Sequence, residues 1–106
     1  MIPEVDLETF AAAHGEGAYV LDVREPYEYH AGHVPGAVLM PMGIVPVRAH
    51  ELPQADPIYV ICQSGSRSYQ AAMWLNRAGF RATSVRGGTG AWAAAGLPTV
   101  TGARAA

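Results

Sequence analysis

A short apolar run, Ile-Tyr-Val-Ile-Cys at residues 58–62, most constrains the fold. β-Branched and aromatic residues without polar alternation are typical of a strand buried on both faces, as at the centre of a parallel sheet. A small polar loop at 63–66 follows this strand, and a helical pattern begins at Arg67. Because parallel strands are joined by crossovers that usually contain helices, this strand–loop–helix unit predicts an α/β fold.

Strands and helices alternate along the rest of the chain. We expect further strands at 19–23, 38–40 and 82–85, and helices at 7–13, 26–31, 47–52, 67–78 and 90–95. The helix at 67–78 has the clearest period, with apolar residues three or four positions apart on one face. The alternation predicts a parallel sheet covered by helices on both faces. We expect one domain over residues 1–100, followed by a frayed tail at 101–106.

Composition excludes several functional classes. The seven basic residues are all arginine, and nine acidic residues leave a net charge of −2. We therefore expect no nucleic-acid or anionic-membrane partner, since a chain with this near-neutral charge does not attract a polyanion over long range. No apolar run approaches the roughly 18 residues of a membrane helix, and the first residues lack the basic and apolar regions of a signal peptide. We expect a cytoplasmic protein without an organic cofactor.

Cys62 is the single cysteine, so it forms no internal disulfide and no cysteine-rich metal site. It follows a buried strand, at the edge where α/β sheets bind ligands. Gly65 lets the loop curl so that backbone N–H groups face the thiol, and Arg67 adds positive charge at the helix start. This setting predicts a nucleophilic thiolate. The alternative, a small buried hydrophobe, needs neither the polar loop nor the arginine.

Five short motifs in order carry a family resemblance: Asp-Val-Arg-Glu-Pro-Tyr-Glu at 22–28, Gly-His-Val-Pro-Gly-Ala at 32–37, Cys-Gln-Ser-Gly-Ser-Arg-Ser at 62–68, Gly-Gly-Thr-Gly-Ala-Trp at 87–92 and Ala-Gly-Leu-Pro at 95–98. Together they resemble the single-domain rhodanese (thiosulfate sulfurtransferase-like) family over nearly the whole chain. The resemblance implies a rhodanese-like α/β fold, with a five-stranded, mainly parallel sheet flanked by helices on both faces.

The resemblance also implies a sulfurtransferase. Cys62 would accept a sulfane sulfur from thiosulfate or a persulfide donor and pass it, as a persulfide, to a thiophilic acceptor: a thiol, cyanide or a partner protein. The substrate would be bound by Gln63, Ser64, Gly65, Ser66, Arg67 and Ser68, with Arg67 meeting the anionic end of the donor. Gln63 stands where the forms that use 3-mercaptopyruvate have glycine, which favours thiosulfate or a persulfide donor.

Four other residues receive structural interpretations. We expect Asp22, Arg24 and Glu28 to hold a strand-to-helix corner by hydrogen bonds and ion pairs; the alternatives are catalytic carboxylates and an arginine facing the anionic substrate. The resemblance implies that His33 is a structural residue away from the sulfur, rather than a general base.

Two rival functions remain open. One is a non-enzymatic rhodanese-like binding or regulatory module. The other is a phosphatase or arsenate reductase of the same fold, which carries one more residue between its cysteine and arginine. Here four residues, 63–66, separate Cys62 from Arg67, and Ser68 stands where the phosphatase arginine would be. The shorter loop disfavours the second rival.

Overall fold

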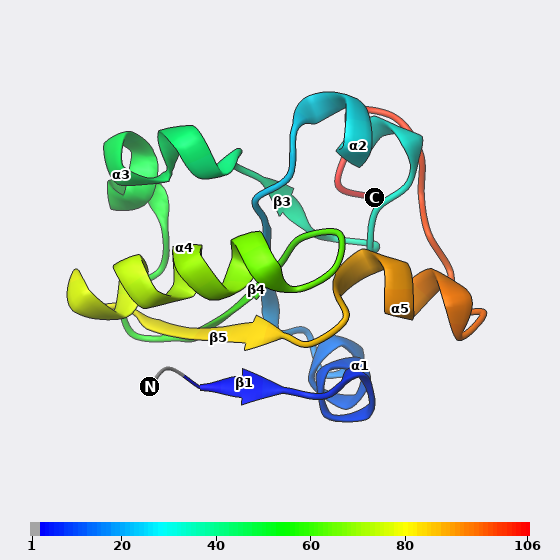
Figure 1. Cartoon of the computed structure of the whole chain (residues 1–106), viewed down its shortest axis with the longest axis horizontal. Coiled ribbons are helices and arrows are strands. Elements are labelled where there is room, and N and C mark those ends of the chain that lie inside the picture. The colour runs from blue at the N-terminus through cyan, green and yellow to red at the C-terminus, as the bar shows by residue number, and fades with distance from the viewer. Residues whose placement is uncertain (1–2) are drawn as a thin grey trace.

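The computed structural model describes residues 3–106 and contains a five-stranded sheet in the order β1-β5-β4-β2-β3 (Figure 1). Its strands are β1 (Glu4–Val5), β2 (Tyr19–Asp22), β3 (Val38–Leu39), β4 (Pro57–Ile61) and β5 (Arg81–Val85). Each pair of neighbouring strands is parallel. The predicted α/β fold with a mainly parallel sheet is therefore confirmed. Met1 and Ile2, part of the expected 1–100 domain, lie outside the described residues.

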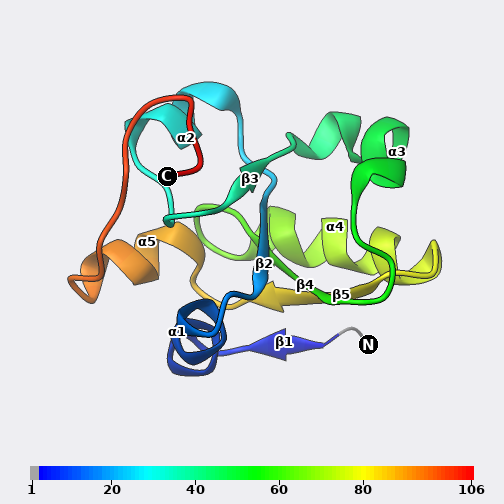
Figure 2. The same ribbon diagram turned by 180° about the vertical axis from the view of Figure 1, so that it is seen from behind.

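Helices cover both faces of the sheet, as expected. They are α1 (Leu7–Gly15), α2 (Pro26–Ala31), α3 (Val45–Arg48), α4 (Ser66–Arg77) and α5 (Gly88–Ala94). Helices α3 and α4 pack into one buried cluster, and α1, α2 and α5 pack into the other. Figures 1 and 2 show this arrangement from opposite sides. Within residues 3–106, no helix has the length and apolar character to span a bilayer.

Two elements differ from the sequence-based expectations. No strand was expected before residue 19, yet β1 pairs with β5, and the Arg86 N–H donates to the Val5 carbonyl at 2.9 Å. A two-residue strand is too short to show an alternating pattern. The helix expected at 47–52 is instead α3 followed by a 3-10 turn at Ala49–Glu51; the helix starts earlier, at Val45, with Pro46 in its first turn.

The C-terminal tail was expected to fray, and the structure shows it bound to the 30–36 segment instead. The Gly102 N–H donates to the His30 carbonyl at 2.9 Å, and the Gly36 N–H donates to the Ala105 carbonyl at 2.7 Å. His33 is fully buried, and its Nε2 lies 2.7 Å from the Arg104 carbonyl. Nδ1 of the same ring lies 2.8 Å from the Tyr29 carbonyl. Backbone hydrogen bonds and one buried side chain thus hold a segment whose sequence has no apolar pattern.

Replacing His33 tests this structural role. His33→Ala is expected to lower the free energy of unfolding by about 2–4 kcal/mol, because it leaves a cavity and deprives two carbonyls of a partner. The matched control is His30→Ala, since His30 is exposed and lies three residues away. Urea denaturation of both variants gives the comparison. Equal losses in the two variants would contradict the role assigned to His33.

Candidate active site

The thiol of Cys62 lies at the carboxyl end of β4, as the sequence predicted. The residue is only 1% exposed, although the loop that follows it reaches the surface. The Gly65 N–H donates to Sγ at 3.1 Å, and Ser68 Oγ lies 3.4 Å from Sγ. Gly65 has a φ of +109° as the N-cap of α4, and this left-handed conformation turns its N–H toward the sulfur. The loop therefore provides donors for a negative charge on Sγ.

Opposing effects set the pKa of the Cys62 thiol. Burial raises the pKa, because the charged form loses solvent. Hydrogen bonds from the Ser68 side chain and from the backbone N–H groups of Ser68, Gly65 and Ser64 lower it, and together they leave the pKa below its ordinary value. The stabilisation of the thiolate thus comes from short-range dipoles rather than from exposure to water.

A second buried serine, Ser84, extends this network and was missed by the sequence analysis. Ser84 lies on β5, and its Oγ is 2.9 Å from the Oγ of Ser68. Both serines are completely buried. The available sequence signal was a pair of hydroxyl residues, Thr83 and Ser84, within the strand expected at 82–85, but nothing in the sequence paired Ser84 with position 68.

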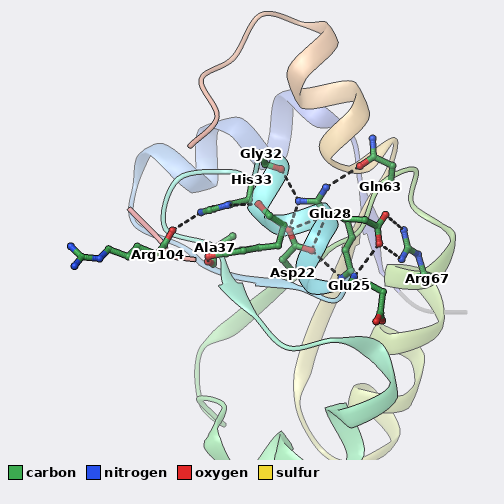
Figure 3. Close-up of polar contacts among 11 residues, drawn as sticks. Asp22, Glu25, Glu28, Gly32, His33, Ala37, Gln63, Arg67 and Arg104 are labelled. Carbon is green, nitrogen blue, oxygen red and sulfur yellow. Dashed lines mark hydrogen bonds and ion pairs between the residues drawn. The ribbon is translucent and has the colours of Figure 1, made fainter. Parts of the chain in front are cut away.

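Arg67 faces a carboxylate in the structure. Its Nη1 and Nη2 atoms donate to the two carboxylate oxygens of Glu28, each at 2.8 Å (Figure 3). This hydrogen bonding lowers the pKa of Glu28 to about 2 and raises the pKa of Arg67. The Glu25 N–H also donates to Glu28, at 3.0 Å, within the first turn of α2. Glu28 thus caps the start of α2, at the strand-to-helix corner where the sequence placed it, and also ties α2 to α4.

Asp22 and Arg24 form the expected corner, and Arg24 extends it to the cysteine loop. The two side chains are 0% and 3% exposed, and Arg24 Nη2 lies 2.9 Å from Asp22 Oδ2. Nη2 also donates to the Gly32 carbonyl at 2.9 Å, and Nη1 donates to Gln63 Oε1 at 3.0 Å. Figure 3 labels Asp22, Gly32 and Gln63, the three residues that these contacts join to Arg24. The Asp22 carboxylate is fully buried and is bonded to Arg24.

The Gly-Gly-Thr-Gly turn lies directly against the same loop. The Thr89 N–H donates to the Cys62 carbonyl at 2.8 Å, and the Gly90 N–H donates to the Gln63 carbonyl at 2.9 Å. A Cβ at Gly88 would collide with the Cys62 carbonyl oxygen and lie 2.7 Å from the Gln63 carbonyl carbon. Of the other predicted loop residues, Ser64 and Ser66 are exposed. The cysteine loop is therefore held on one side by the turn at 87–90, and its serines on the other side are exposed.

Comparison with known proteins decides the family. A family model for the Rhodanese-like domain matches residues 6–95. The chain belongs to the rhodanese-like domain family. It is 39% identical over 103 residues to the "Sulfurtransferase" of Allochromatium vinosum, covering 94% of this chain and 96% of that protein.

Two further similar proteins differ in how much of their length is matched. The chain is 46% identical over 82 residues to the "Putative sulfur carrier protein YrkF" of Bacillus subtilis, covering 76% of this chain and 44% of that protein. The chain therefore spans less than half of that relative. The crystal structure of a rhodanese-related protein from Thermoplasma volcanium gives a TM-score of 0.89 at 27% identity, covering 94% of this chain and 99% of the other. These findings confirm the resemblance and support a sulfurtransferase role in general.

The contact beneath the rhodanese loop can be tested at Gly88. Gly88→Ala is expected to lower the free energy of unfolding by about 1–3 kcal/mol, because the added methyl meets backbone atoms and the residue has a positive φ. The matched control is Gly43→Ala, since a Cβ there meets nothing within 4 Å. Thermal denaturation gives the comparison. If Gly88→Ala were as stable as Gly43→Ala, the result would contradict the close contact between Gly88 and the Cys62 backbone.

The Glu28–Arg67 pair predicts a pH-dependent contribution to stability. The pKa of Glu28 falls from 4.5 to about 2 on folding, so its contribution is complete above pH 4.5 and is lost as the pH falls through about 2. Glu28→Gln should therefore destabilise the protein at pH 6, and the difference from the parent should shrink toward pH 2. Glu8→Gln, an exposed site on α1, is the control. Urea denaturation across pH 2–6 checks this; a gap independent of pH would contradict it.

Proposed function

We propose that this protein is a thiosulfate-type sulfurtransferase in which Cys62 carries the sulfane sulfur as a persulfide. The observation that carries the proposal is the buried Sγ, which has a Gly65 N–H at 3.1 Å and a serine hydroxyl at 3.4 Å. Those donors favour a thiolate, the form of cysteine that attacks a sulfur atom. The family relationship and the name of the Allochromatium relative support the coarser part of the proposal, a sulfurtransferase role in general.

Two displacements complete the reaction. In the first, the Cys62 thiolate attacks the outer sulfur of thiosulfate, the S–S bond of the donor breaks, and sulfite leaves with the electron pair. In the second, a thiolate or cyanide attacks the outer sulfur of the persulfide, and Sγ leaves as a thiolate. No electrons are gained or lost overall, so the reaction needs no redox cofactor. The acceptor comes from another molecule, since the sequence contains one cysteine.

The loop residues divide the work of holding charge. The Gly65 N–H and the Ser68 hydroxyl stabilise negative charge on Sγ both before attack and on leaving. Arg67 uses two of its five N–H donors on Glu28, and its half-exposed guanidinium keeps donors for the anionic end of thiosulfate. The donor is a small anion, because Cys62 is almost completely enclosed.

Substitution of the cysteine and the arginine tests this mechanism. Cys62→Ser should take up no sulfur from thiosulfate, because a hydroxyl stays protonated at neutral pH. The parent protein should gain the mass of one sulfur atom, removable by a thiol wash.

Arg67→Ala should load about ten- to a hundredfold more slowly than the parent protein, which corresponds to the loss of a charge-assisted hydrogen bond. Arg77→Ala, an exposed arginine on the same helix, is the control. Intact-mass spectrometry follows each reaction.

The outcomes separate the rival functions. A parent protein that stays unloaded with thiosulfate and with persulfide donors would contradict the proposal and favour the non-enzymatic binding module. Release of phosphate from an aryl phosphate would favour the phosphatase. Loading of Cys62→Ser would exclude Cys62 as the sulfur carrier, and equal loading by the two arginine variants would exclude the role of Arg67.

A further inference from the structure

Two buried hydroxyls lie in line behind the candidate nucleophile. Ser68 Oγ lies 3.4 Å from Cys62 Sγ, and Ser84 Oγ lies 2.9 Å from Ser68 Oγ. The three atoms come from the end of β4, the first turn of α4, and β5. Ser68 and Ser84 have no exposed surface, so bulk water does not compete for their protons. Among residues 3–106, the hydrogen-bond partner of the Ser84 hydroxyl is Ser68 Oγ.

The number of protons in this chain restricts its orientation. Each serine hydroxyl has one proton and can also accept. If Ser68 donates its one proton to a thiolate on Sγ, Ser84 must be the donor in the hydrogen bond between the two serines. Both hydroxyl protons then point toward the sulfur. If Ser68 donated to Ser84 instead, a thiolate would face an oxygen lone pair. The charge on Sγ and the direction of both hydroxyl protons are therefore coupled.

We propose that Ser84 is a positioning residue for sulfur transfer: it donates a hydrogen bond to Ser68 and thereby directs the Ser68 proton at Cys62 Sγ. This inference rests on the proposed function for the role of the thiolate, although the geometry is independent of any substrate. Arg67 is the charged group that acts electrostatically with Cys62, and Glu28 already neutralises it. Because the charge of Arg67 is already neutralised, the two serine hydroxyls supply a large part of the local stabilisation of the Cys62 thiolate.

The two half-reactions respond differently to such a network. A hydrogen-bonded thiolate is more populated but intrinsically a weaker nucleophile, whereas a stabilised thiolate is a better leaving group. Above the pH at which Cys62 is fully ionised, the chain therefore gives the loading step no advantage. It favours the release step, in which Sγ departs with the electron pair. Ser84 assists the transfer of sulfur to the acceptor more than its capture from the donor.

The test measures ionisation of Cys62 without any sulfur substrate. The rate of iodoacetamide alkylation is followed against pH in the parent protein, Ser68→Ala, Ser84→Ala and the double variant. Ser68→Ala should raise the pH midpoint by about one to two pH units, because it removes a hydrogen bond to a charged group. Ser84→Ala should raise the midpoint by about 0.1–0.6 of a pH unit, which is the share of roughly 10–30% expected when one hydrogen bond polarises the next. Adding Ser84→Ala to Ser68→Ala should raise it no further.

Two further variants keep the test decisive. Thr83→Val removes the hydroxyl of the neighbouring residue, whose side chain points to the other face of β5, and should leave the midpoint unchanged. Ser84→Thr keeps the hydroxyl and should retain the midpoint of the parent. An unchanged midpoint in Ser84→Ala, or an equal Ser84 effect in the Ser68→Ala background, would overturn the proposal. Absence of sulfur loading by thiosulfate would count against the proposed function alone.

Discussion

The buried guanidinium of Arg24 is the interaction on which the rest of the site depends. A positive charge that is 3% exposed requires a counterion and acceptors for its N–H groups. Asp22 provides the counterion, and the Gly32 carbonyl and the Gln63 amide oxygen accept further hydrogen bonds. These partners come from the end of β2, the end of α2 and the cysteine loop. One desolvated cation therefore determines how three distant segments meet, and removing any one partner leaves buried charge or buried donors unsatisfied.

A second consequence concerns which groups stabilise the thiolate. Arg24 is neutralised by Asp22, and Arg67 is neutralised by Glu28, so neither guanidinium presents an unpaired charge to Sγ. The groups that lower the pKa of the Cys62 thiol are all neutral: the Ser68 hydroxyl and the backbone N–H groups of Ser68, Gly65 and Ser64. Oriented dipoles in an enclosed site stabilise a developing charge without reorganising during the reaction. The ion pairs build the frame, and the dipoles act on the sulfur.

The sequence predicted what lies within about twelve residues and missed what depends on distant pairing. The apolar run of β4, the glycine loop and the start of α4 are local patterns, and they placed Cys62 correctly. The partner of Arg67 was not predictable in this way, because Glu28 lies 39 positions away and a local reading makes it a helix-start residue. β1 has two residues and no period. The tail is held by backbone groups and by His33 rather than by an apolar face, so its sequence has no apolar pattern from which its position could be predicted.

The position of Ser84 follows from the order and register of the strands. β4 and β5 are parallel neighbours, and Val60 pairs with Ser84. Paired residues point to the same face, and Cys62 lies two residues beyond Val60, so Ser84 and Cys62 share the face that α4 covers. The first turn of α4 then places Ser68 between them. A register shift of one residue would turn Ser84 to the opposite face. The network is thus a product of the parallel β5-β4 pairing, which no single segment of the sequence specifies.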